Sequence, residues 1–242
     1  MKSPEYHITR LDTVDSTNSE AARHYATAAD LDVWVAAFQE AGRGQQQNRW
    51  ESEAGKNLLF SIFFRPSNLP AEKQFLLSQL ISLALCDSLL QEGVKAVIKW
   101  PNDIYVGEKK IAGILLEHNI SGAYVSSSIA GIGLNVNQSV FHSAPNPTSL
   151  FLETNRLFNL HLLLQKIVEN VKKYYLPINP KQLQEQYLSH LLFYKQWADY
   201  KTSNGILFKA QIVDVRSTGE LVLINELGGN QNFAFKEVFL CQ

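Results

Sequence analysis

The sequence predicts an α+β protein, in which a mixed sheet carries flanking helices and a small β-barrel follows at the C-terminus. Three observations support this class. Apolar runs of strand length recur between residues 33 and 134, an apolar pattern of helical length covers residues 71–91, and the composition changes near Gln196. We therefore expect a first domain over residues 1–195 and a second, SH3-like domain over residues 196–242.

The composition is that of a folded protein with a sizeable core. The 242 residues include 22 basic and 23 acidic side chains without a long basic run, which argues against broad nucleic-acid binding. Cys86 and Cys241 form no CxxC motif, which fits buried thiols in a reducing compartment and gives no sign of a zinc site. The N-terminus lacks the apolar core of a signal peptide, and Ser78, Gln79 and Ser82 interrupt the most apolar helix. We expect a soluble, cytoplasmic protein that binds neither DNA nor a membrane.

The first element is a strand over residues 6–14, which leads into the polar segment DSTNSE at residues 15–20. Thr17 and Glu20 have the spacing of a capping box, and the alanine-rich residues 21–29 predict the helix that it would start. Helix capping by itself would explain this segment. A cap needs only one or two polar side chains, however, and four cluster here beyond a strand end, where α/β folds tend to bind ligands.

A second strand, residues 33–38, leads into a loop that contains glycine. The strand VWVAAF is apolar throughout, as expected of a buried strand. The loop reads QEAGRG over residues 39–44 and ends in Trp50. Glycines on both sides of Arg43 let backbone amides approach a ligand closely. A surface turn would have a similar composition, but the position after a buried strand favours a loop that orders over a bound anion.

The central stretch, KWPNDIYVGEKKIAGILLE at residues 99–117, is expected to form a bent strand and a hairpin that turns at Gly107. It places Lys99, Asp103 and Lys110 where a buried sheet would carry no charge. Two ammonium groups and one carboxylate suit a phosphate anhydride with its magnesium ion. A structural ion pair between Asp103 and a lysine is the alternative.

Strands and one long helix surround this stretch. Residues 57–64 form an apolar strand, and residues 71–91 form a helix whose apolar residues recur every three or four positions, as on a stripe that faces the core. A strand over residues 123–132 ends in GIGLNVN, where the glycines permit close approach and Asn135 supplies an amide.

Two further helices, at residues 158–175 and 180–192, precede the C-terminal strands. The segments GILFKAQIVDV, ELVLINE and QNFAFKEVFL are separated by glycine turns. Three or more such strands predict a barrel of about forty residues.

Five segments occur in a fixed order: DSTN, QEAGRG, KWPNDI, KIAGILLE and GIGLNVN. Each is weak evidence alone, but in this order they resemble the biotin protein ligases, also called biotin acetyl-CoA-carboxylase ligases. The similarity spans most of residues 6–150, and the C-terminal strands fit the small SH3-like domain of that family. The resemblance implies the class II synthetase-like fold that biotin and lipoate ligases share.

The resemblance also implies a two-step reaction with ATP and Mg²⁺. The carboxylate of biotin attacks the α-phosphate of ATP to give biotinyl-5′-AMP, and a lysine of a biotin carboxyl carrier protein then attacks the mixed anhydride. Because a carboxylate and a polyphosphate repel each other, positioned cations must supply most of the catalysis.

The resemblance assigns roles to the positions that match the motifs. The implied catalytic residues are Lys110, Lys99, Asp103 and Arg43, with Asp103 as the metal ligand. The residues implied to bind biotin are Ser16, Thr17, Asn18, Gln39, Arg43, Gly44, Gln45, Lys110 and Gly113. Those implied to bind the nucleotide are Gly42, Arg43, Gly44, Gln45, Arg49, Trp50, Asn102, Lys110 and Asn135. The loop over residues 42–50 should close over the adenylate and exclude water.

This loop departs from the common pattern of the family. Many members have GRGRxGR, where this chain has Gln45 for the second arginine and Gln47 for the next glycine. Glutamine carries no charge, so we expect the adenylate to be held less tightly, with Arg49 compensating. An arginine variant, Gln45→Arg, that fails to slow the release of biotinyl-AMP would contradict this expectation.

The start of the chain distinguishes two types of family member. The larger, bifunctional members carry a DNA-binding winged helix before the catalytic domain, whereas here DSTN begins at residue 15. We therefore expect an enzyme without repressor function whose partner is a carrier protein, as a monomer or a homodimer.

Two other functions fit parts of the pattern. A lipoate or octanoate ligase shares the catalytic fold but lacks this combination of GRG loop and KWPND, and a test of acyl-acid preference would separate it. A non-catalytic module that binds biotin or a nucleotide would not need both Lys99 and Lys110 together with Asp103. Biotin-dependent exchange of pyrophosphate into ATP distinguishes an enzyme from such a module.

Overall fold

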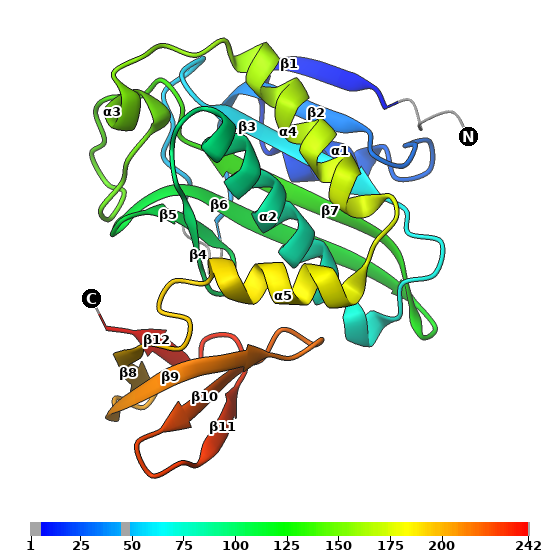
Figure 1. Ribbon diagram of the computed structural model, residues 1–242. Coiled ribbons are helices and arrows are strands. Elements are labelled where there is room, and N and C mark those ends of the chain that lie inside the picture. Colours follow the sequence, from blue (N-terminus) through cyan, green and yellow to red (C-terminus); the bar gives the residue numbers. More distant parts are fainter. Residues whose placement is uncertain (1–5, 45–48, 242) are drawn as a thin grey trace.

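The computed structural model describes residues 6–44 and 49–241 (Figure 1). Its larger sheet has seven strands in the order β1-β2-β3-β7-β6-β5-β4. β1 and β2 are parallel and the other neighbours are antiparallel, so the predicted mixed sheet is confirmed. The strands are β1 (Ile8–Val14), β2 (Val33–Gln39), β3 (Leu58–Phe64), β4 (Val97–Lys99), β5 (Asp103–Val106), β6 (Lys109–Ser121) and β7 (Tyr124–Leu134).

Three helices, α2 (Phe75–Gln91), α4 (Leu160–Tyr175) and α5 (Pro180–His190), cover one face of this sheet (Figure 1). A 3-10 turn, Ala71–Lys73, precedes α2. Residues 71–91 are long and apolar enough to cross a membrane, but 67% of their most apolar window is buried inside the molecule. This segment is therefore the core helix of the fold.

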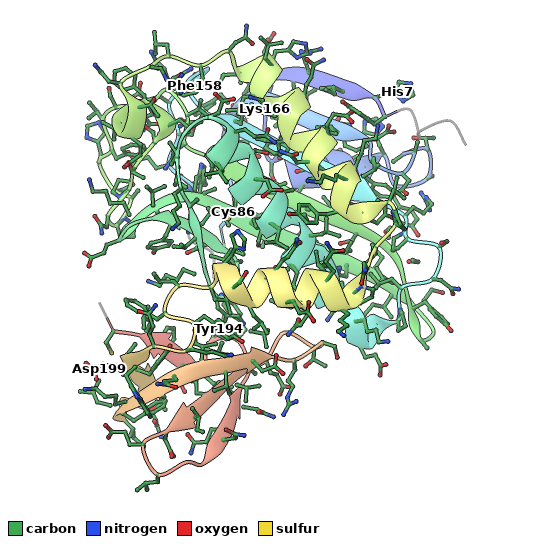
Figure 2. All side chains as sticks on the ribbon, in the orientation of Figure 1. His7, Cys86, Phe158, Lys166, Tyr194 and Asp199 are labelled. Atoms are coloured by element: carbon green, nitrogen blue, oxygen red, sulfur yellow. The ribbon has the colours of Figure 1, made fainter. Side chains whose placement is uncertain are left out.

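The predicted apolar stripe on α2 is wrong, because the helix is buried on all sides. Its polar residues Ser82 and Ser88 lie inside the core, where their hydroxyls donate to the carbonyls of Ser78 and Ala84 at 2.8 and 2.6 Å. The sheet packs on one side of α2 and the helices α4 and α5 pack on the other, so residues 76–86 have no solvent face, whereas Leu90 in the last turn is exposed. Figure 2 shows Cys86 of α2 within this layer.

α1 (Thr17–Arg23) packs on the opposite face of the sheet. Side chains alternate along β3, so Phe60 joins the core beneath α2 whereas Phe63 packs against Ala21 of α1. The capping-box prediction is wrong: Ser16 is the N-cap residue, its side chain makes no capping hydrogen bond, and Thr17 is already helical.

The central stretch also differs from the predicted bent strand. β4 and β5 pair antiparallel, with Lys99 opposite Asp103, so the chain reverses between them. A second reversal at Gly107, where φ is 56°, leads into β6 as expected.

The C-terminal strands form a separate antiparallel sheet of five strands in the order β11-β10-β9-β8-β12. These strands are β8 (Trp197–Thr202), β9 (Leu207–Val215), β10 (Leu221–Asn225), β11 (Asn230–Phe233) and β12 (Val238–Leu240). The indole of Trp100 donates to the carbonyl of Gly219 at 2.9 Å, and Tyr194 bridges to Ile212, so both contacts join the two parts. Figure 2 labels Tyr194 between α5 and the C-terminal sheet. The small helix α3 (Leu150–Thr154) was not expected from the sequence.

Candidate active site

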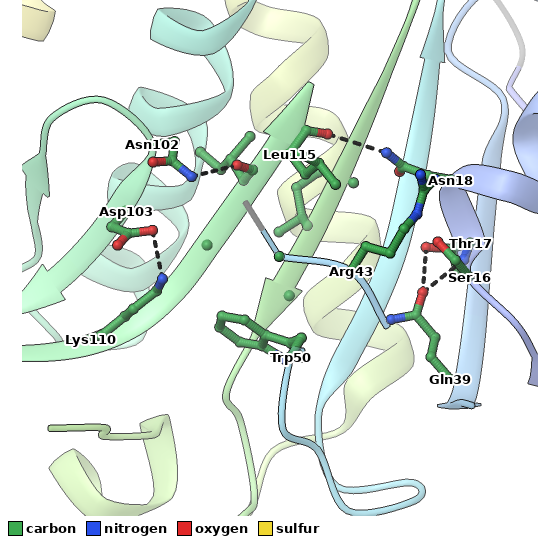
Figure 3. Close-up of a pocket in the computed structure, with 16 residues that line it drawn as sticks. Ser16, Thr17, Asn18, Gln39, Arg43, Trp50, Asn102, Asp103, Lys110 and Leu115 are labelled. Carbon is green, nitrogen blue, oxygen red and sulfur yellow. Dashed lines mark hydrogen bonds and ion pairs between the residues drawn. The ribbon is translucent and has the colours of Figure 1, made fainter. Parts of the chain in front are cut away.

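A polar pocket lies on the α1 side of the larger sheet, where β2, β6 and β7 meet the start of α1 (Figure 3). It gathers most of the positions that the sequence motifs indicated. The lining residues are Ser16, Thr17, Asn18, Gln39, Arg43, Gly44, Trp50, Asn102, Asp103, Lys110, Gly113, Ile114, Leu115, Gly131, Ile132 and Gly133.

One end of the pocket is a hydrogen-bonded cluster at the start of α1. The side-chain oxygen of Gln39, at the end of β2, accepts from the backbone N–H of Thr17 at 2.7 Å and lies 3.1 Å from its hydroxyl. Ser61 of β3 lies 2.7 Å from the same hydroxyl and 2.6 Å from Oδ1 of Asn18. Thr17, Asn18 and Ser61 are all buried. The packing against β3 therefore fixes these groups before any ligand binds.

Glu117 on β6 connects this cluster to the glycine-containing loop. One of its carboxylate oxygens accepts from the amide of Asn18 at 2.7 Å, and the guanidinium of Arg43 contacts both oxygens at 3.1 and 3.3 Å. Arg43 is thereby held against the sheet by an ion pair with two contacts. The two described ends of the loop meet here, because the N–H of Trp50 donates to the carbonyl of Gly42 at 3.1 Å and Arg43 bridges to Arg49.

Three glycines of β6 and β7 make room for these side chains. A Cβ on Gly131 would lie 2.3 Å from Oδ1 of Asn18, and one on Gly133 would lie 2.5 Å from the indole of Trp50. At Gly113 the distance to the same indole would be 3.0 Å. The sequence predicted that the strand carrying Gly131 ends at Ile132, within GIGLNVN, which is wrong: β7 continues to Leu134, so Gly131 and Gly133 both lie inside it. The prediction of close approach holds, with protein side chains as the neighbours.

The other end of the pocket is charged. The ammonium of Lys110 lies 2.7 Å from Oδ1 of Asp103 and 5.5 Å from the centre of the Trp50 ring (Figure 3). Asn102 stands beside them, and its amide donates to the carbonyl of Ile114 at 2.8 Å. The structural ion pair between Asp103 and a lysine, the alternative to a binding site, thus exists, and it lines the pocket.

Lys99 is placed differently. Its ammonium lies 4.8 Å from the centre of the Tyr105 ring and 3.4 Å from the hydroxyl of that residue. It lines a neighbouring cavity of about 150 Å³ between the larger sheet and the C-terminal strands, together with Trp100 and Phe235. Burial lowers the pKa of Lys99, while the nearby Asp103 carboxylate opposes that shift. The structure therefore brings Lys110 and Asp103 together in the polar pocket and places Lys99 beside it.

A larger cavity of about 630 Å³ continues from the charged end. It shares Gly44, Trp50, Asn102, Asp103 and Lys110 with the polar pocket, and its other lining residues are Arg49, Glu51, Pro101, Asn135, Phe141, Ser143, Ala144, Pro145, Pro147 and Phe235.

Asn135 is a fixed and partly unpaired group in this larger cavity. Its side chain is buried, and Nδ2 donates to the carbonyl of Thr148 at 2.9 Å. In the described part of the chain, its Oδ1 atom has no hydrogen-bond partner. A buried acceptor without a partner is costly, which points to a donor supplied by a ligand.

The side chains that line the two cavities suit a magnesium ion only if the ion also binds a nucleotide. Among residues 6–44 and 49–241, no group of three or more His, Cys, Asp or Glu side chains could hold a metal. Mg²⁺ is usually bound by one or two carboxylates together with substrate phosphates and water. Asp103 is such a carboxylate, so it fits a metal that arrives with a nucleotide.

The sequence analysis did not single out some residues that the structure places at or beside these cavities, and one residue that it did single out lies outside the described part of the chain. Ser61 had a visible signal, since it is the single polar residue in the apolar run LLFSIFF, and Glu117 likewise ends the apolar run of KIAGILLE. No local signal marks Glu51. Gln45 and the contrast with arginine-bearing loops lie outside the described residues.

Comparisons with known proteins identify the family to which the chain is similar. The model of the biotin/lipoate A/B protein ligase family matches residues 10–135. The chain is 38% identical over 132 residues to the biotin--[acetyl-CoA-carboxylase] ligase of Paracoccus denitrificans, covering 52% of this chain and 53% of that protein. It is 34% identical over 127 residues to the bifunctional ligase/repressor BirA of Escherichia coli, covering 52% of this chain and 39% of that protein. The chain thus spans about half or less of the length of these curated relatives.

The fold is also that of a solved biotin protein ligase. The structure of the Aquifex aeolicus enzyme in complex with biotin and ATP superimposes with a TM-score of 0.80 at 24% identity, covering 98% of this chain and 99% of that one. This likeness establishes the fold, and the family model covers more than half of the 242 residues. The chain therefore belongs to the biotin/lipoate A/B protein ligase family.

Proposed function

We propose that the protein activates biotin with ATP to form biotinyl-5′-AMP and transfers biotin to a lysine of a biotin carboxyl carrier protein. The observation that carries this proposal is the pair of joined cavities, which share the Lys110 and Asp103 ion pair. The polar pocket is suited to a carboxylic acid that carries hydrogen-bonding groups at the end away from its carboxylate. The larger cavity is suited to a nucleotide. The reacting groups would meet at the lysine.

The polar end of the first pocket is suited to the ureido ring of biotin. That ring offers two N–H groups and one carbonyl, and Ser16, Thr17 and Gln39 place hydroxyl, amide and backbone groups at the pocket end. The walls include Ile114, an apolar side chain, as a bicyclic ligand requires. A site of buried polar groups discriminates strongly against analogues that lack the matching partner.

The larger cavity is suited to ATP because of Asn135. Its unpaired Oδ1 can accept from the exocyclic amine of adenine, while the guanine oxygen at the same position would face another acceptor. Trp50 offers an aromatic surface and Arg49 a charge in the same cavity. The Aquifex aeolicus relative was solved with biotin and ATP bound.

The charged residues suit the chemistry of the first step. Lys110 would neutralise the biotin carboxylate and then the acyl phosphate as the bond to the α-phosphorus forms and pyrophosphate leaves. Asp103 would hold magnesium, which when bound neutralises charge on the triphosphate. Lys99 would neutralise phosphate from its own cavity, which shares Pro101 and Phe235 with the larger one.

The loop carrying Arg43 would keep water from the adenylate. The ion pair with Glu117 holds Arg43 against the sheet, and the bridge to Arg49 joins the two described ends of the loop. In the second step, the lysine of the carrier attacks the acyl carbon and AMP leaves. We further propose the domain division at residue 195, supported by the separate C-terminal sheet, and a cytoplasmic location, supported by the two free cysteines.

The test is biotin-dependent exchange of radiolabelled pyrophosphate into ATP by the purified chain, followed by biotinylation of a carrier domain. We expect exchange with biotin and little or none with lipoate or octanoate. Exchange that depends on lipoate would assign the chain to the other branch of the family. Tight biotin binding without exchange would make it a binding protein.

A further inference from the structure

Glu51, the residue after Trp50, makes a set of contacts that the reaction outlined above does not use. Its Oε1 accepts from the backbone N–H of His142 at 2.6 Å. Its Oε2 accepts from the N–H of Ser143 at 2.7 Å, from the Ser143 hydroxyl at 2.8 Å and from the N–H of Ala144 at 2.8 Å. One carboxylate thus receives four hydrogen bonds from three consecutive residues, which we name the wall segment, 142–144.

The wall segment depends on Glu51 for its position. Successive backbone N–H groups form a concave site for an anion, and here the anion is a side chain of the protein. In the part of the chain that the structure describes, these three amides have Glu51 as their acceptor in place of a backbone carbonyl. The flanking chain is anchored separately, since Ser149 donates to the carbonyl of Gln138 at 2.6 Å.

The wall segment also forms one side of the larger cavity. Ser143 and Ala144 line that cavity together with Trp50 and Asn135. No residue of the segment lines the polar pocket. A shift of the segment would therefore change the nucleotide end and leave the biotin end as it is.

We propose that Glu51 is a positioning residue that fastens the wall segment to the end of the Trp50 loop and so shapes the nucleotide cavity. The inference rests on the proposed function, because it assigns the larger cavity to ATP. Charge-assisted hydrogen bonds are about twice as strong as neutral ones, so one carboxylate can hold a segment that lacks regular secondary structure.

The first test is the variant Glu51→Gln, with Glu53→Gln as its matched control. The control removes the same charge from an exposed side chain two residues away, for which the described residues provide no hydrogen bond. In Glu51→Gln we expect the KM for ATP to rise about tenfold, with kcat and the KM for biotin changed less than about twofold. In Glu53→Gln, the KM for ATP, kcat and the KM for biotin should all stay near their wild-type values.

A second readout follows the segment itself. Amide hydrogen exchange at residues 142–144 should accelerate about tenfold in Glu51→Gln, and less in Ser143→Ala, which removes one of the four donors. If Glu51→Gln folds poorly, Ser143→Ala still tests the inference, because it removes one of the hydrogen bonds to Glu51 and leaves the carboxylate in place. An unchanged KM for ATP together with unchanged exchange at these amides overturns the inference.

The two proposals can fail separately. A wild-type chain that shows no biotin-dependent pyrophosphate exchange contradicts the proposed function. In that case the role of Glu51 is still tested by comparing the wild type with Glu51→Gln. The two measurements are amide hydrogen exchange at residues 142–144 and the affinity for a non-hydrolysable ATP analogue. Equal analogue affinity in the wild type and in Glu51→Gln would contradict the positioning role even in an active enzyme.

Discussion

The ammonium of Lys110 lies 2.7 Å from the carboxylate of Asp103, with 27% and 23% of the two side chains exposed. The pair is neither a solvated surface contact nor a fully buried one. It forms because β5 and β6 are antiparallel with Lys110 paired to Tyr105. Asp103 lies two residues from Tyr105 on the same face of β5, so Lys110 and Asp103 are diagonal neighbours. Lys110 and Asp103 therefore form an ion pair and also line the proposed binding site, so the two interpretations of their charges are compatible.

Replacing Lys110 by alanine should slow biotin-dependent pyrophosphate exchange by several hundredfold or more. Removing one preorganised charge from a transition state typically costs roughly 3 to 4 kcal/mol. The control is Lys109→Ala, which removes an exposed lysine next to it on the same strand and should leave the rate within about twofold. If Lys110→Ala kept a tenth of the wild-type rate, the lysine would not be the group on which the first step depends.

The variant Asp103→Asn tests the magnesium assignment. It should lower the exchange rate about a hundredfold and raise the Mg²⁺ concentration needed for half-maximal rate about tenfold. Glu108→Gln, in the exposed turn between β5 and β6, should change neither. A lower rate with an unchanged Mg²⁺ requirement would mean that Asp103 only orients Lys110.

Asn135→Ala should reduce the preference for ATP over ITP. Hypoxanthine has an oxygen where adenine has an amine, so the wild-type Oδ1 would face an acceptor, and the variant loses that discrimination. The measurement is the ratio of kcat/KM for the two nucleotides, which we expect to fall about tenfold or more. General damage to the fold would lower kcat/KM for ATP and for ITP alike and leave their ratio unchanged.

Alanine at Gly131 and at Gly133 should affect different substrates. The methyl group at Gly131 would displace Asn18, whereas that at Gly133 would displace Trp50. We expect Gly131→Ala to raise the KM for biotin about tenfold or more, and Gly133→Ala to act mainly on the KM for ATP. The two variants add the same group to the same strand, so each is the control for the other. Equal effects on both substrates would show that the added methyl groups distort β7 as a whole.

The stability of the protein in acid should depend on Glu51. Burial alone would raise the pKa of Glu51, but hydrogen bonds from His142, Ser143 and Ala144 lower it from 4.5 to about 2. Because the folded pKa is the lower one, the carboxylate stabilises the fold above pH 4.5, and that contribution is lost as the pH falls towards 2. Between about pH 5 and pH 2 the wild type should thus lose more free energy of unfolding than Glu51→Gln, as measured by urea denaturation. Parallel curves for the two proteins would contradict this.

Local patterns were enough to predict many elements and motif positions. Apolar runs and periodicity are properties of neighbouring residues, so β2, β3 and α4 appear close to their expected limits. The same patterns were misleading for α2, because an apolar stripe can be recognised in a helix that other elements enclose on every side. They also ended β7 too early, before Gly133, since glycine marks a turn as readily as a close approach inside a strand.

By itself the sequence determined most of the strands and helices, the order of the five motifs and the charges that would need partners. Only the tertiary structure decided which partners those are. Ser61 reaches Thr17, 44 residues away, and Glu51 reaches Ser143, 92 residues away. Strand register also turned Lys110 towards Asp103 in the polar pocket and placed Lys99 against Tyr105 beside it. Contacts of this kind depend on how strands pair and how loops return to the sheet, and this long-range packing is not encoded in the spacing of any one segment.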